Sequence, residues 1–317
     1  MIRKVKPLSA PATRADLPLQ ANISQARPKR TSALCLSKRR KEDTSLKSQL
    51  RPWVSWGLAA SFLLAILTGI ILSYPFREDS PLVSTVGIEA VVPFGYLFRY
   101  LHYYTGQFTF LLLVWHTTEA LLSKAYERRS FKDWFLLTST YPLTILALFT
   151  GYIVRGDETG FAAGRIAENL AASIPFLGSI LNRIFFAVTE EGVHRAYMAH
   201  VFFSIGVLVA LGIWHFRPRR LSIKDLSLWA TAALSLSFLY PPALEAPFFS
   251  TNLKGPWFFL GVQELLRHLS PFWAGILFPL LPLLALGLYP KNPRVAFWGL
   301  LGWHLVYFFL LLRGLWR

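Results

Sequence analysis

The chain has 317 residues, of which 54% are hydrophobic, and a net charge of +16. A mean hydropathy of +0.41 excludes an ordinary soluble domain. A charge of this size is also found in nucleic acid-binding proteins, but its uneven distribution along the chain argues against a nucleic acid-binding function. Uncharged stretches long enough to cross a bilayer recur in the sequence. The sequence therefore predicts an all-α, polytopic membrane protein.

Residues 1–51 are basic, rich in Ser and Pro, and poor in aromatic residues. This composition predicts a mostly disordered cytoplasmic tail that contacts anionic lipid or a partner subunit. We do not expect a secretory signal, because the first apolar run begins near residue 52 and is too long. The only cysteine, Cys35, lies in this tail, which excludes an intramolecular disulfide and a cysteine-ligated iron–sulfur cluster within this chain.

Seven apolar stretches follow the tail and are predicted to be transmembrane helices. The second and fourth contain histidines, and prolines interrupt the fifth and sixth. The fifth and seventh are close to the lower length limit for crossing a bilayer. The predicted spans are 52–76, 100–118, 134–154, 196–216, 226–244, 268–290 and 295–312.

Basic residues are concentrated on one side of this predicted topology. With seven spans, the tail, the loops 119–133 and 217–225 and the turn 291–294 share a side, which carries 23 of the 33 Lys and Arg but only 7 of the 17 acids. The whole charge excess therefore falls on that side. The positive-inside rule then predicts a cytoplasmic N-terminus and an outer C-terminus. Because topology accounts for the charge excess, we expect no nucleic acid partner.

Four histidines lie inside two of the predicted spans. "HYYTGQFTFLLLVWH" runs from His102 to His116, and "HVFFSIGVLVALGIWH" runs from His200 to His215. In an α-helix, a spacing of 14 places both rings on one face about 21 Å apart, and a spacing of 15 ends about 60° past four turns. Two parallel helices of this kind present two pairs of facing imidazoles, one near each membrane surface.

Paired imidazoles at two depths are typical of two haem irons whose axial positions are both occupied, an arrangement suited to electron transfer. A lone membrane histidine is more often a hydrogen-bonded interior residue or part of a proton path. His268 and His304 have no such partner and are expected to be structural. Arg99 and Arg195 lie three and five residues before the outer histidines. They would bind haem propionates or act as helix-end cations at the interface.

These residues resemble the cytochrome b of the quinol–cytochrome c reductases, the bc and bf complexes. The 15-residue spacing is more similar to the bf type and related bacterial proteins than to the mitochondrial type. Other similar stretches are "WGLAASFLLAILTG", "FTGYIVRGDETGF", "HRAYMAH" and "GPWFFLGVQELLR". The resemblance covers roughly residues 52–300. It implies a four-helix di-haem domain at 52–220, fused to a three-helix quinol-site domain at 221–317 that is a separate subunit in part of the family.

The resemblance also implies roles for particular residues. Gly69 and Gly151 would let a haem edge approach a helix backbone, since glycine has no Cβ. The segment 155–195 would help to form the roof of an outer quinol-oxidation site. His102 and His200 would bind an outer, low-potential b haem. His116 and His215 would bind an inner, high-potential b haem. Both haems would be non-covalent.

The implied reaction is quinol oxidation at the outer face. One electron passes to a Rieske iron–sulfur protein, and the other crosses through both haems, against much of the membrane potential, to a second quinone near the cytoplasmic face. The implied partners are a Rieske protein, a c-type cytochrome subunit, membrane lipid and a second copy of this chain in a homodimer. The implied location is a bacterial inner membrane, which the chain crosses several times.

The quinol-oxidation motif departs from that of the family. The family's Pro-Glu-Trp-Tyr corresponds to "GPWFF", in which Trp257 matches, Pro256 takes the place of the glutamate and Phe258 that of the tyrosine. Quinol oxidation releases protons, so an acceptor is needed. We expect Glu264, the nearest acid, seven residues after Trp257 and on the same face if the stretch is helical, to accept one. Glu245 and Glu158 are the other candidates. The alternative is an interfacial carboxylate paired with Arg267.

Two further departures concern neighbouring regions. The family's Pro-Trp after the third span is Arg155-Gly156 here, which reshapes the quinol site. The bf type attaches an extra haem through a cysteine at the start of the first span, where this chain has Trp53. Because Cys35 lies about 18 residues too early, we expect no covalently held third haem.

Two other functions compete with this interpretation. A membrane haem anchor that links the quinone pool to a different dehydrogenase or reductase is favoured by the missing glutamate and the altered Pro-Trp. A transporter whose histidines relay protons would bind no haem, and the sequence shows no obvious inverted repeat to support it.

Overall fold

The computed structural model describes residues 53–216, 221–244 and 253–316, which are helical with short connections and contain no strand. All of them fall within one compact unit, Ser48–Arg317. The predicted tail and Cys35 lie outside the described residues. The all-α fold class is therefore confirmed, whereas the boundary predicted at residue 220 between two domains stays a prediction.

Four helices are long and apolar enough to cross a membrane: Trp53–Ser73, Phe131–Val154, His194–His215 and Pro293–Trp316. A fifth span is α3 (Gly95–Leu122), if it is taken together with α2 (Pro81–Ala90), to which it is bent by 114°. The described part of the chain thus holds four to five such spans.

The predicted count of seven spans is not confirmed, although helices lie at all seven positions. The fifth stretch forms α11 (Ile223–Leu239), which has 17 residues and ends just before Pro241 and Pro242. The sixth forms the apolar helix Phe272–Leu288, also of 17 residues, which follows Pro271 and ends two residues before Pro290. Proline lacks the N–H that a helix interior requires and clashes with the preceding turn. Both helices therefore fall short of the roughly 20 residues that a bilayer demands.

Local sequence signals explain where several helices begin. Side chains of Ser130, Asp157 and Ser222 accept hydrogen bonds from backbone N–H groups in the first turns of α4 (Phe131–Thr138), α6 (Glu158–Ala172) and α11. Within the spans, threonine hydroxyls donate to carbonyls four residues earlier, as Thr105 does to Leu101 at 2.7 Å. Such bonds satisfy polar groups where lipid offers no partner.

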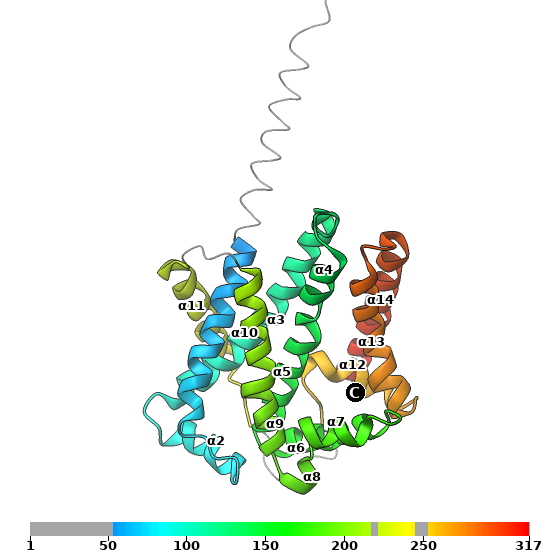
Figure 1. Cartoon of the computed structure of the whole chain (residues 1–317). Helices are drawn as coiled ribbons and strands as arrows, with labels where there is room; N and C mark the ends of the chain where they lie inside the picture. Colours follow the sequence, from blue (N-terminus) through cyan, green and yellow to red (C-terminus); the bar gives the residue numbers. More distant parts are fainter. Residues whose placement is uncertain (1–52, 217–220, 245–252, 317) are drawn as a thin grey trace, which may run out of the picture. The chain divides into compact units, whose positions relative to one another are not determined.

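The long helices run side by side between two ends (Figure 1). Short helices gather at the lower end in that view: α2, α6, α7 (Gly178–Phe185) and α8 (Val188–Glu191). The rest of the order is η1 (Ala125–Arg128), α5 (Thr140–Val154), α9 (His194–Met198), η2 (Ala199–Ser204), α10 (Ile205–His215), α12 (Trp257–Leu265), η3 (Phe272–Leu277), α13 (Phe278–Leu288) and α14 (Pro293–Trp316).

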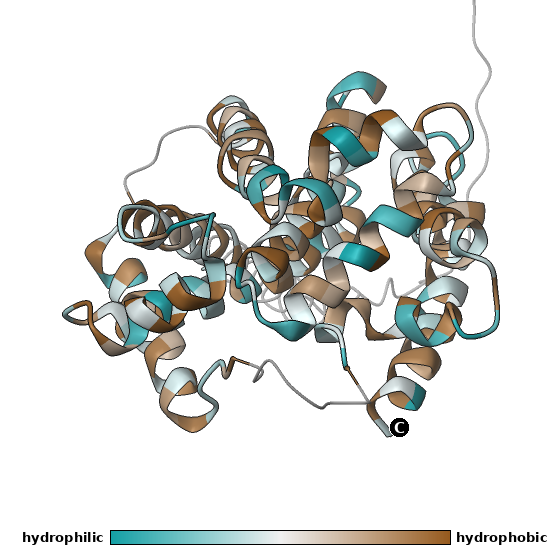
Figure 2. Ribbon diagram, turned by 90° about the horizontal axis from the view of Figure 1, so that it is seen from below, coloured by the Kyte–Doolittle hydropathy of each residue, from teal (hydrophilic) through white to brown (hydrophobic). Residues whose placement is uncertain are grey.

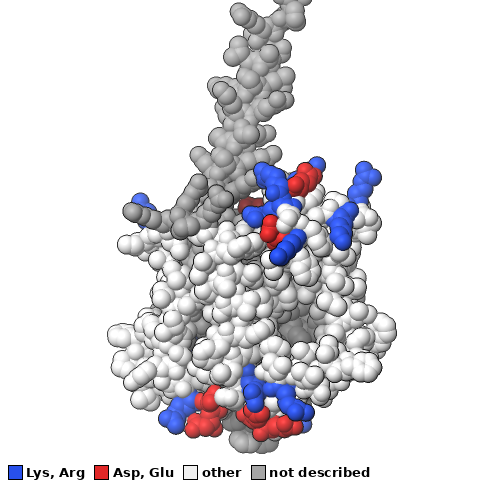
Figure 3. All heavy atoms as spheres, viewed as in Figure 1, with Lys and Arg blue, Asp and Glu red and all other residues white. Residues whose placement is uncertain are grey.

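The described surface is that of a protein whose solvent is partly lipid. Charged side chains gather at the two ends and leave an uncharged belt between them (Figure 3). Seen from the lower end, apolar residues lie along much of the helix surfaces (Figure 2). Large apolar side chains such as Ile213 and Phe309 are well exposed at 76% and 62%. This exposure is expected where hydrocarbon covers the helices.

Candidate haem site

The four predicted histidines form two facing pairs. His102 on α3 faces His200 on η2, with ring centroids 6.0 Å apart and ring planes at 82°. His116, further along α3, faces His215 at the end of α10, with centroids 6.2 Å apart and planes at 68°. The first pair lies nearer the end that holds α2 and α6, and the second lies nearer the opposite end.

A π-helical turn explains how unequal spacings reach matching depths. Residues Ala199–Ser204, which include His200, form a π-helix within the fourth span. A π turn contains one residue more than an α turn. It absorbs the extra residue in the 15-residue spacing, so that His200 and His215 face His102 and His116, which are 14 residues apart on a continuous α-helix. π-Helical turns are frequent at functional sites.

Backbone carbonyls orient His102 and His200, the pair predicted to be the outer one and called the outer pair below. The Nδ1 atom of His102 lies 2.9 Å from the carbonyl oxygen of Ala65, and that of His200 lies 2.8 Å from the carbonyl oxygen of Ala147. Each Nδ1–H therefore donates to a carbonyl and leaves the Nε2 lone pair free to bind a metal. A hydrogen bond of this kind to the second ring nitrogen is the usual support of a metal-binding histidine.

The inner pair is supported differently. The Nδ1 of His116 lies 3.2 Å from the hydroxyl of Ser55. The Nδ1 of His215 is buried and has no hydrogen-bond partner among the residues that the structure describes.

Two glycines make room for the outer rings. A Cβ at Gly69 would lie 3.0 Å from Cε1 of His102, and one at Gly151 would lie 2.8 Å from Cε1 of His200. The role predicted for these two glycines was to let a haem edge approach the helix backbone. The structure shows the imidazoles themselves against the bare backbone, so an added methyl would displace a ring.

The paired rings fit a six-coordinate haem iron. Two metal–nitrogen bonds of about 2 Å each, plus half a ring on either side, come to about 6 Å between centroids, which matches both pairs. In the described ranges no cluster of three or more His, Cys, Asp or Glu could hold a bare metal ion. Two protein ligands suffice when a macrocycle supplies the others.

The two predicted propionate arginines lie in different settings. The side chain of Arg99 is 11% exposed, forms an ion pair with Glu89 on α2 and donates to the carbonyl oxygen of Pro242 at 2.9 Å. The side chain of Arg195 is 41% exposed and binds the Glu191 carboxylate through Nε at 2.7 Å and Nη2 at 3.1 Å. These hydrogen bonds lower the pKa of the Glu191 carboxyl.

The predicted quinol-site residues belong to α12 and its N-cap. Pro256 is the N-cap, and the indole of Trp257 donates to Oε1 of Gln107 on α3 at 2.9 Å. Trp257 is 37% exposed, whereas Glu264 is only 2% exposed. The sequence did not point to Gln107, although a polar residue between the two histidines of one span was a usable signal.

Three basic side chains surround Glu264. Its carboxylate lies 3.0 Å from Nε of Arg313 on α14, 3.3 Å from Nε of Arg267 and 3.5 Å from Nε2 of His268. The Arg267 contact is the one that the alternative interpretation of Glu264 predicted. Arg313 was missed, although it is the one charged residue in the last turns of an apolar helix.

A pocket lies between α6 and the segment that leads into and forms α12. α6 belongs to the 155–195 connection, and the facing segment contains Pro256 and Trp257. The pocket is lined by Thr159, Ala162, Ala163, Ile166, Leu253, Lys254, Gly255, Phe259 and Gln263.

In this helical membrane bundle, imidazole rings face each other in two pairs at two depths. This arrangement is that of a membrane haem protein. The sequence profile of the family described as Cytochrome b/b6/petB matches residues 42–220, more than half of the chain. The chain belongs to the cytochrome b family.

Known relatives agree with this assignment. The chain is 31% identical over 169 residues to a cytochrome b of Schizosaccharomyces japonicus, covering 51% of this chain and 43% of that protein. It is 28% identical over 163 residues to a cytochrome b of Bugula neritina, covering 50% and 44%. The match thus spans less than half the length of these relatives. A chain of a structure described as "Hyperthermophilic respiratory Complex III" shares the fold, with a TM-score of 0.60, 18% identity and 83% coverage of both chains.

Proposed function

We propose that this chain is the di-haem cytochrome b subunit of a Rieske-type quinol:cytochrome c oxidoreductase. The observation that carries the proposal is the pair of facing imidazole sets, with centroids 6.0 and 6.2 Å apart at two depths of one bundle. When bound, the haems supply one-electron transfer across the membrane.

The protein's own groups hold and orient the cofactors in this proposal. His102 and His200 bind the outer iron through Nε2, and the carbonyls of Ala65 and Ala147 fix the ring planes. His116 and His215 bind the inner iron, and Ser55 orients the His116 ring. Arg99 lies at the outer end as a cation for a propionate.

Quinol is oxidised at the outer face, between α6 and α12, in this proposal. Support comes from Trp257, which a hydrogen bond to Gln107 holds beside α3, and from the small pocket that these two elements line, which would have to widen to admit a quinol ring. Pro256 sets the start of α12. Glu264 accepts a proton and passes it to His268, whose side chain is 47% exposed and reaches solvent.

The chain acts within a larger assembly in a bacterial inner membrane, with its N-terminus cytoplasmic. Its single cysteine cannot hold an iron–sulfur cluster, so a Rieske protein must supply that cluster. A c-type cytochrome accepts electrons from it, a second copy of the chain completes a homodimer, and quinone is the substrate on both sides.

A second function, a haem anchor for a different dehydrogenase or reductase, is favoured by one observation. Pro256 stands where the family has its glutamate, and the nearest acid, Glu264, is held by two arginines. Purification of the intact complex through a tag on this chain separates the two. A co-purifying Rieske cluster, seen by electron paramagnetic resonance, together with quinol-dependent reduction of cytochrome c, is the expected result. Two haems with another oxidoreductase and no Rieske signal would establish the anchor instead.

A further inference from the structure

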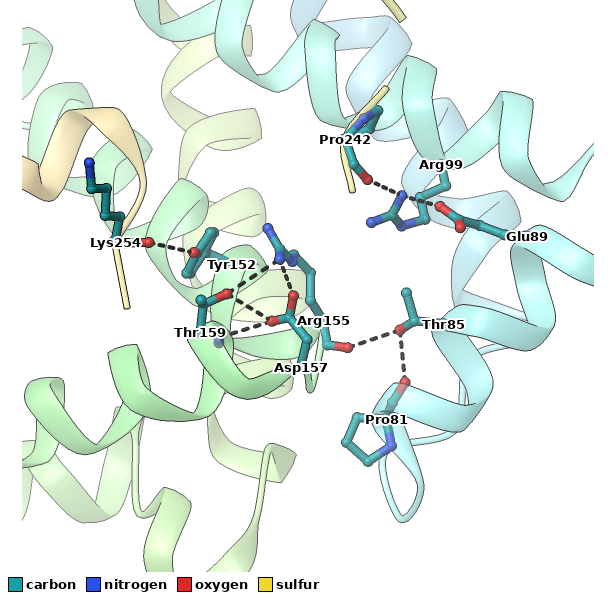
Figure 4. A network of polar contacts seen from close by, with 11 residues as sticks. Pro81, Thr85, Glu89, Arg99, Tyr152, Arg155, Asp157, Thr159, Pro242 and Lys254 are labelled. Carbon is teal, nitrogen blue, oxygen red and sulfur yellow. Dashed lines mark hydrogen bonds and ion pairs between the residues drawn. The ribbon is translucent and has the colours of Figure 1, made fainter. Parts of the chain in front are cut away.

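Two ion pairs that are largely shielded from solvent lie where α2, α3, α5 and α6 meet (Figure 4). Arg99 on α3 pairs with Glu89 on α2, and Arg155, the C-cap of α5, pairs with Asp157, the N-cap of α6. Glu89 and Asp157 neutralise the two guanidinium groups one for one. A further anion at this place would therefore be recognised by an unused N–H donor rather than by excess positive charge.

Arg155 has hydrogen-bonding capacity that its neighbours leave unused. Its guanidinium lies 4.5 Å above the ring of Tyr152, and its Nη2 donates to the Asp157 carboxylate and, at 3.4 Å, to the hydroxyl of Thr159. Its Nε is buried and has no hydrogen-bond partner among the described residues. A buried donor without an acceptor is costly, and a guanidinium has five N–H donors to satisfy.

The position of Arg155 on α5 relates it to the outer histidine pair. It follows Gly151 by four residues, and Gly151 contacts the His200 ring. Residues four apart lie on one helix face about 6 Å apart along the axis. Side chains on a helix lean toward its N-terminus, and the contact with Tyr152 shows this lean. Arg155 therefore lies one turn beyond the outer pair, on the face that contacts it.

We propose that Arg155, together with Arg99, binds the carboxylates of the outer haem, the role that the sequence pattern had indicated for Arg195. This rests on the proposed function, since it requires a haem between His102 and His200. Arg195 is half-exposed and already binds Glu191 through two nitrogens. The side chain of Arg155 is only 15% exposed, and its buried Nε–H has no acceptor among the described residues.

Asp157 positions Arg155 for this contact. The carboxylate is fully buried, and it accepts hydrogen bonds from the backbone N–H of Gly160 at 2.9 Å and from the hydroxyl of Thr159 at 3.3 Å. Its orientation is therefore fixed by the first turn of α6. A fixed acid restrains the guanidinium through Nη2 and leaves the Nε donor for a ligand.

Redox titration of the purified complex tests the proposal, with both b haems followed by their reduced-minus-oxidised spectra. A nearby cation favours the reduced form, so Arg155→Gln should lower the midpoint potential of the outer haem and leave the inner one unchanged. Arg155→Lys should give a smaller shift in the same direction, because an ammonium keeps the charge but loses the fork geometry. The matched control, Arg195→Gln, should shift neither haem.

Equal outer-haem potentials in wild type and Arg155→Gln would overturn the proposal, as would a shift confined to Arg195→Gln. Should Arg155→Gln fail to assemble, Arg155→Lys decides, and a wild-type potential in that variant would also overturn it. A wild-type complex without an outer haem would instead remove the proposed function.

Discussion

At the residue scale, backbone carbonyls and glycines without a Cβ form the slot that holds the two rings of the outer pair. His102 and His200 each donate Nδ1–H to a carbonyl of a neighbouring helix, and each ring lies against a glycine. The rings are thus fixed before any metal arrives, so little conformational entropy remains to be lost on binding. The inner pair has weaker support in the described residues, with one bond to Ser55.

Gly151→Ala should reduce the retention of the outer haem. The added Cβ would lie 2.8 Å from Cε1 of His200, and the ring cannot retreat without breaking its bond to Ala147. The b-type spectrum of the purified variant is expected to lose its outer component and keep the inner one. Gly299→Ala is the control, because nothing lies within 4 Å of that position. Two fully retained haems in Gly151→Ala would show that the slot tolerates a methyl group.

Glu264→Gln should slow quinol oxidation by about 100-fold or more, the usual loss when a general base is removed. Full reduction of both haems by a chemical reductant would show that the variant is assembled. Glu191→Gln, at an exposed ion pair, should keep the wild-type rate. A wild-type rate in Glu264→Gln would exclude Glu264 as the proton acceptor and leave it a structural role, in the ion pair with Arg313 that joins α12 to α14.

At the element scale, the sequence predicted which stretches are helical better than how long they are. All seven apolar stretches coincide with helices, because hydrophobicity alone marks them. Helix length depends on where proline ends a helix, and Pro241 and Pro290 lie just past the ends of α11 and Phe272–Leu288. The π-helical turn at Ala199–Ser204 had one trace in the sequence, the spacing of 15 instead of 14.

The candidate site likewise has features that the sequence predicted and features that it did not. Periodicity sufficed to pair the four histidines, because ligand spacing follows directly from helix geometry. The partners of Arg155 and Arg99 were not predicted, although they are near in the sequence: Asp157 follows Arg155 by two residues and Glu89 precedes Arg99 by ten. Both contacts form where the chain turns between two helices, and such a turn leaves no periodic signal in the sequence.

Close packing between the first helix and α11 predicts a size limit at Gly57. A Cβ there would lie 2.7 Å from the Trp229 ring, which also packs on Trp53 with centroids 5.6 Å apart. Gly57→Val should therefore destabilise the protein by about 1–3 kcal/mol through overpacking, measured as a lower melting temperature of the haem spectrum. Gly302→Val, in open space on α14, is the control. Equal melting temperatures would mean that α11 does not pack as described.

At the scale of the whole molecule, charge is distributed unevenly between the two ends of the bundle. In the described residues, bases outnumber acids at the end that holds η1 and the start of α14, and the two balance at the end that holds α6 and α8. This asymmetry is what the positive-inside rule requires if the first end is cytoplasmic.

Cys35 offers a direct test of that orientation, because it is the only cysteine and lies in the predicted cytoplasmic tail. A membrane-impermeant maleimide should leave it unlabelled in intact cells and label it in inverted membrane vesicles. Cys35→Ser controls for labelling of other proteins. Labelling in intact cells would reverse the topology and move the proposed quinol site to the inner face.

The haem content per chain tests the central claim most directly. A pyridine haemochrome assay on the purified membrane protein, combined with a redox titration, is predicted to give two extractable b haems with distinct midpoint potentials. One iron for each facing pair of imidazoles accounts for that number. A chain that binds no haem would contradict the account and return the four histidines to a proton path.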